Sequence, residues 1–123
     1  MNSCCNYNTR EKGNQVEEKD IKKETAKILR NMGMRVEFKG YKYWQIAMDC
    51  VVKGFCEATK GDICVAVAKR CRKPISSVER CLRYSVDNVN AKDFFKTNQK
   101  VTVSSFLVFL IEKLEEEAGI NVF

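Results

Sequence analysis

The segment PISSVERCLRYSV, residues 74–86, decides the fold that the sequence predicts. On a helix, at about 100° per residue, its apolar residues recur at the i, i+3, i+4, i+7 spacing of a buried stripe. That stripe consists of Val78, Cys81, Leu82, Ser85, Val86 and then Val89. The opposite face carries Ser76, Arg80, Arg83, Tyr84 and Asp87, with Ser77 and Glu79 on its flanks. Guanidinium, phenol and hydroxyl groups that point outward can contact phosphates and base edges.

The preceding segment also has the pattern of a short helix. Asp62 can cap it, and its inner face consists of Ile63, Val67 and Cys71 with Ala66 and Ala68 beside them. Its end is basic, with Lys69, Arg70, Arg72 and Lys73. Two short helices joined by about three residues predict a helix-turn-helix at about 62–89. The pattern alone leaves a second interpretation open, two amphipathic helices of an ordinary helical domain with solvated arginines.

Three stretches, GYKY at residues 40–43, SSVERCLRY at 76–84 and residues 106–114, together resemble one family, the sporulation-initiation response regulators (stage zero sporulation protein A). Residues 40–43, GYKY, followed by Ala47 and Met48, are similar to the family's GYxYxxxAI stretch. Residues 76–84, SSVERCLRY, resemble its recognition helix, and residues 106–114 resemble its last helix. Their order and spacing match from about residue 25 to 114. The resemblance implies an all-helical DNA-binding effector domain that acts as a transcriptional regulator.

The resemblance also implies roles for individual residues. The family's base-reading positions fall on Ser77, Glu79 and Arg80, although Ser77 stands where the family has an arginine, so we do not expect the family's own target sequence. For the DNA backbone we expect contacts from Ser76, Arg83, Tyr84, Lys69, Arg70 and Lys73. Glu79 has a second interpretation, a capping box with Ser76 at the helix start.

The resemblance also implies binding partners. They are double-stranded DNA, an RNA polymerase sigma factor and a second copy of the chain on DNA. The family's receiver domain has no counterpart here, so we expect no phosphorylation switch. An alternative is a protein-interaction module, or antagonist, that pairs with a full-length relative and has lost specific DNA reading. Ser77, the short 88–100 segment and the apolar last helix motivate that alternative.

Composition limits the class of protein. With 123 residues, 45% of them hydrophobic, we expect one domain. No apolar run approaches the roughly 20 residues of a membrane span, and residues 1–15 are polar, so we expect a cytoplasmic protein. The net charge is +6, and residues 53–83 alone carry eight Lys and Arg against three Asp and Glu. Residues 104–123 are acidic, so the basic excess lies on the predicted helix-turn-helix. Such clustering suits binding to a polyanion, and ordinary solubilising charge is the second interpretation.

The chain has seven cysteines and no histidine. Cys50, Cys56, Cys64, Cys71 and Cys81 form no CxxC pair, so neither a zinc site nor a disulfide framework is expected. Apart from Cys64, we place them on or beside apolar helix faces. Without histidine or a phosphate-binding glycine loop, we expect neither an enzyme nor a cofactor.

The remaining segments complete an all-α, compact bundle of about five to six helices. We expect a disordered tail over residues 1–15 and a single helical domain over 16–123. The first helix should span 16–32 and stop at Gly33, and Val36 and Phe38 should then enter the core. The next helix begins at Gly40, with these residues inward: Tyr43, Ile46, Ala47, Cys50, Val51 and Phe55. Trp44 should be half exposed. Residues 88–100 form a loop or short turn around Phe94 and Phe95, and a helix over 102–118, ended by Gly119, packs against the first helix or a second copy.

Overall fold

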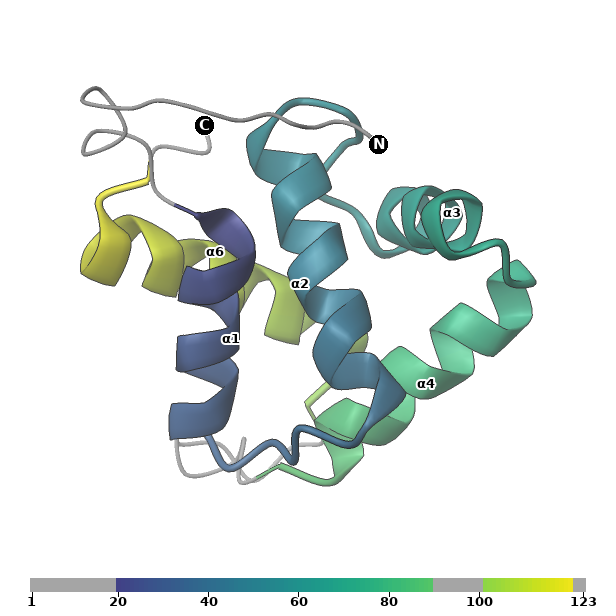
Figure 1. Ribbon diagram of the computed structural model, residues 1–123, viewed down its shortest axis with the longest axis horizontal. Helices are drawn as coiled ribbons and strands as arrows, with labels where there is room; N and C mark the ends of the chain where they lie inside the picture. The colour runs from purple at the N-terminus through teal and green to yellow at the C-terminus, as the bar shows by residue number, and fades with distance from the viewer. Residues whose placement is uncertain (1–19, 90–100, 121–123) are drawn as a thin grey trace, which may run out of the picture.

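The computed structural model describes residues 20–89 and 101–120. This part of the chain folds into five helices and contains no strand: α1 (Ile21–Asn31), α2 (Lys39–Val52), α3 (Lys60–Cys71), α4 (Ile75–Asp87) and α6 (Val103–Ala118) (Figure 1). The predicted all-α bundle is confirmed. The expected tail over 1–15 and the expected contacts of Phe94 and Phe95 lie outside the described residues.

Two glycines end helices as the sequence predicts. Gly33 has a φ of 90°, and the following Met34 N–H donates to the Leu29 carbonyl at 3.0 Å. Gly119 has a φ of 68°, and the following residue bonds back to Leu114 in the same way. A left-handed residue lets the chain turn back and satisfy the last carbonyls of a helix, and glycine adopts that conformation without steric cost.

The first helix is shorter than predicted. Asp20 is extended, with φ −81° and ψ 104°, and its side chain accepts the Lys23 N–H at 3.2 Å. Asp20 is therefore the N-cap, and α1 begins at Ile21 rather than at residue 16.

Two predictions about the burial of side chains in and after α2 are wrong. Trp44 is fully buried, whereas Phe55 is 66% exposed. Trp44 can be buried because its indole N–H donates to Ser85 Oγ at 3.0 Å and its ring lies against Phe106. Phe55 lies outside because α2 ends at Val52, so the helical period does not extend to it.

The connector between α1 and α2 also differs from the prediction. Val36 is 60% exposed and does not enter the core, because the Phe38 N–H bonds the Arg35 carbonyl and places Val36 at the corner of a turn. Phe38 is half-buried against the core and forms an edge contact with Tyr84, the ring centroids 5.3 Å apart.

The last helix packs as predicted. Thr102 caps α6 in a reciprocal pair with Ser105, and the helix contacts α1, α4 and α3. Its buried face contains the predicted stripe Phe106, Leu107, Leu110, Ile111 and Leu114.

Helices α2 and α4 approach each other closely at Gly40. A Cβ placed on Gly40 would lie 2.5 Å from Ser85 Cβ and 2.8 Å from the Cys81 carbonyl oxygen. Only a residue without a side chain allows this approach. Because the Trp44–Ser85 hydrogen bond lies one turn further along α2, the two contacts fix how α4 sits in the bundle.

Candidate nucleic-acid interface

Helices α3 and α4 are joined by residues 72–74, the three-residue connection that the sequence predicts. Arg72 adopts the left-handed conformation, with φ 56°, and the Lys73 N–H donates to the Ala68 carbonyl at 3.0 Å. The predicted cap of α3 is wrong. Thr59 caps this helix, and its hydroxyl accepts the N–H of Asp62, which lies in the first turn.

Pro74 is the N-cap of α4, and no side chain caps the helix. The capping box between Ser76 and Glu79 is therefore not formed. Proline is tolerated at a helix start because its missing N–H would have no helical partner there.

Glu79 instead forms an ion pair with a residue of α3. Its Oε2 lies 2.7 Å from Lys60 Nζ, so the carboxylate links the start of α3 to α4. The hydrogen bond from Lys60 is the main cause that lowers the pKa of Glu79, and the positive charges of Lys60 and Arg83 add to it. Glu79 is half-buried in this position.

The two faces of α4 divide as the sequence predicts. Val78, Leu82, Ser85 and Val86 are buried, and Cys81 is half-buried. Ser76, Arg80, Arg83 and Tyr84 are exposed, and Ser77 is half-buried on the flank. Among the residues that the structure describes, neither Arg80 nor Arg83 forms an ion pair with an acidic side chain. Both guanidinium groups are therefore accessible to an external anion.

The other residues predicted to contact the DNA backbone lie in two different places. Lys69 and Lys73 are exposed near the turn. Arg70 lies against the end of α2, where it is 3.7 Å from the buried Asp49 carboxylate and 5.7 Å from the Phe55 ring centroid. Its charge is already compensated within the molecule, so Arg70 is the least available of these cations.

Lys60 is a residue that sequence reasoning missed. It contributes to the basic stretch, but its partner Glu79 is far from it in sequence. The pairing can be recognised only once the fold brings the start of α3 beside the second turn of α4.

The cysteines lie within or beside the core. Cys50 and Cys64 are buried, so the expectation that Cys64 lies away from the apolar helix faces is wrong. Cys56, Cys71 and Cys81 are half-buried. Burial raises the pKa of the Cys56 thiol to about 11. Within residues 20–89 and 101–120, no three Cys, Asp or Glu side chains are grouped as metal ligands.

Over the same described ranges, no helix is long and apolar enough to cross a bilayer. The chain matches no family model, no curated protein and no solved structure.

Proposed function

We propose that this protein binds double-stranded DNA in a sequence-specific way and acts as a transcriptional regulator, with α4 as its recognition helix. One observation carries the proposal. Arg80 and Arg83 are exposed on one side of α4, while Val78 and Leu82 anchor its other side in the core. A helix whose inner face is buried in the core and whose outer face carries arginines can lie in the major groove. There arginine can donate two hydrogen bonds to guanine.

Within this proposal, Arg80 contacts a base, and Ser77 and Glu79 contact neighbouring bases from the flanks of the helix. Glu79 accepts from a cytosine amine with the oxygen that Lys60 leaves free. Ser76, Arg83, Tyr84, Lys69 and Lys73 contact the sugar–phosphate backbone. Arg70 contributes little, because Asp49 and Phe55 already hold it.

The resemblance to the sporulation-initiation regulators supports the regulatory part of the proposal. A cytoplasmic location, contact with an RNA polymerase sigma factor and a second copy on DNA belong to the same proposal. They depend on the residues at 40–43 and 76–84 that carry the resemblance.

The test begins with selection of bound duplexes from a random DNA library, followed by fluorescence titration of the selected duplex. Arg80→Ala should cost about 1–3 kcal/mol and relax the base preference at one position. Arg83→Ala should weaken binding to every sequence and lower the slope of log affinity against log salt by about one. Lys22→Ala, an exposed cation at the start of α1, is the matched control and should change neither.

Two outcomes would overturn the proposal. One is a wild-type protein that retains no duplex. The other is a DNA affinity that does not depend on salt concentration and is unchanged in the double variant Arg80→Ala, Arg83→Ala. A wild-type protein that co-elutes with a full-length relative and retains no DNA would favour the interaction-module alternative.

A further inference from the structure

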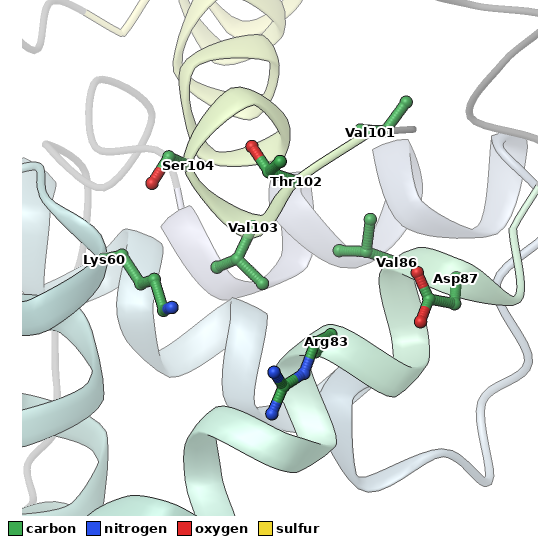
Figure 2. A pocket seen from close by; sticks show the side chains of 8 residues that line it. All are labelled: Lys60, Arg83, Val86, Asp87, Val101, Thr102, Val103 and Ser104. Atoms are coloured by element: carbon green, nitrogen blue, oxygen red, sulfur yellow. The ribbon is translucent and has the colours of Figure 1, made fainter. Parts of the chain in front are cut away.

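A hollow of about 420 Å³ lies beside α4, between the start of α3 and the start of α6 (Figure 2). It is lined by Lys60, Arg83, Val86, Asp87, Val101, Thr102, Val103 and Ser104. Figure 2 shows Lys60 and Arg83 on separate helices, with the guanidinium of Arg83 directed toward the side of Lys60, Val103 between the two and Val86 beside Asp87. The hollow thus combines two cations and the Asp87 carboxylate over a floor of nearly buried valines.

Charge is unevenly distributed around this hollow. The Lys60 ammonium donates one of its three N–H groups to Glu79, which leaves two for another acceptor. Arg83 forms no ion pair with a described acidic residue. Asp87 lies beside Val86, on the side of the hollow opposite Lys60 (Figure 2). Glu79 partly compensates both cations, because it forms an ion pair with Lys60 and is under the charge of Arg83. An anion would therefore sit on the side of Lys60 and Arg83 that faces away from both Glu79 and Asp87.

We propose that this hollow seats one sugar–phosphate unit of the DNA backbone. The phosphate lies between Lys60 and Arg83, with the Ser104 hydroxyl at the rim, and the deoxyribose lies against Val86 and Val103. This inference rests on the proposed function, since Arg83 belongs both to the outward face of α4 and to the wall of the hollow. A DNA backbone in contact with Arg83 would therefore lie at the hollow.

The size and the lining favour a backbone unit over a free oxyanion. A cavity of about 420 Å³ exceeds what one phosphate group fills. Val86 and Val103 are only 3% and 5% exposed, so they form the floor of the hollow, where only the C–H groups of a sugar, and not the oxygens of a free phosphate, could contact their edges. The contact extends the interface from α4 to the start of α6, a helix that sequence reasoning left outside the DNA-binding surface.

The test places a negative charge at the rim. Ser104→Asp should preserve the fold, because an acidic residue in a first helical turn is favourable to the helix. Each phosphate contact contributes about 0.9 to the slope of log affinity against log salt. Loss of one contact in Ser104→Asp should therefore reduce that slope by about 0.9 and weaken binding about eightfold at 0.1 M salt. Lys22→Ala changes the net charge by the same amount. Lys22 is exposed at the start of α1 and does not line the hollow, so Lys22→Ala should leave the slope unchanged.

Ethylation interference on the selected duplex locates the contact. One phosphate should be required by the wild-type protein and not by Ser104→Asp. Equal salt slopes and equal interference patterns for the wild type and Ser104→Asp would overturn the inference. If Arg80→Ala still lost DNA affinity in the same assay, the proposed function would stand. A wild-type protein that binds no duplex overturns both. Displacement of the duplex by inorganic phosphate, at matched ionic strength and only when Ser104 is intact, would assign the hollow to a free anion instead.

Discussion

Replacing Gly40 with alanine tests how α4 is held in the bundle. The added Cβ would lie 2.5 and 2.6 Å from the Cβ and Oγ of Ser85 and 2.8 Å from the Cys81 carbonyl oxygen. Real Cβ contacts are never this short, and one of these neighbours is backbone, so α2 and α4 must move apart. Forcing a methyl group into a packed contact costs about 1–3 kcal/mol.

One gain offsets part of this cost. Alanine is about 0.5–1 kcal/mol better than glycine within a helix. The expected net loss is therefore about 0–2.5 kcal/mol, and each kcal/mol should lower the Tm by about 4 °C, the value between those of smaller and larger domains. Urea unfolding followed by helical circular dichroism measures the free energy directly.

Gly61→Ala is the matched control. Gly61 is the second residue of α3, just as Gly40 is the second residue of α2, and no atom lies within 4 Å of its added Cβ. It should gain up to about 1 kcal/mol in stability. In a Ser85→Gly background, the cost of Gly40→Ala should shrink, because two of the three close contacts are gone. Equal stability of Gly40→Ala and Gly61→Ala would refute the proposed close packing of α2 against α4.

Two further predictions concern the polar contacts of α4. Ser85→Ala leaves the buried Trp44 N–H without its acceptor and should lower the free energy of unfolding, measured in urea, by about 1–3 kcal/mol. In a Trp44→Phe background the same substitution should cost less, and an equal cost there would contradict this cause. Lys60→Met should lower stability at neutral pH, because the pKa of Glu79 is held below its usual value by Lys60. The stabilisation by a carboxylate with a lowered pKa exists above the unfolded pKa and disappears as the pH falls through the folded pKa. The difference between Lys60→Met and wild type should thus vanish in acid, and a difference independent of pH would contradict an ionic link.

Helical periodicity predicted the inner face of α4 because that face needs only residues within one helix. Val78, Leu82 and Val86 follow each other at helical spacing, and every one of them is buried. The stops at Gly33 and Gly119 were equally predictable, since the left-handed conformation is a local property of glycine.

Properties that depend on a second helix were not predictable in this way. Trp44 is buried because Ser85, 41 residues away, accepts its N–H. Phe55 is exposed because the chain leaves the helix three residues earlier. In the candidate site, the outward positions of Arg80 and Arg83 follow from the period, but the partner of Glu79 does not.

The contacts of α4 separate its stability from its proposed chemistry. One flank is fixed to α2 through Gly40, Trp44 and Ser85, and the other is linked to α3 through Lys60 and Glu79. These contacts lie on the inner face and the flanks, so the outer face with Arg80 is not needed to hold the helix. Substitution of Arg80 should then leave unfolding unchanged within about 0.5 kcal/mol, as is usual for a surface site away from packing contacts. If Arg80→Ala destabilised the bundle instead, loss of DNA binding in that variant would report a disturbed fold, and the assignment of Arg80 as a base-reading residue would fail.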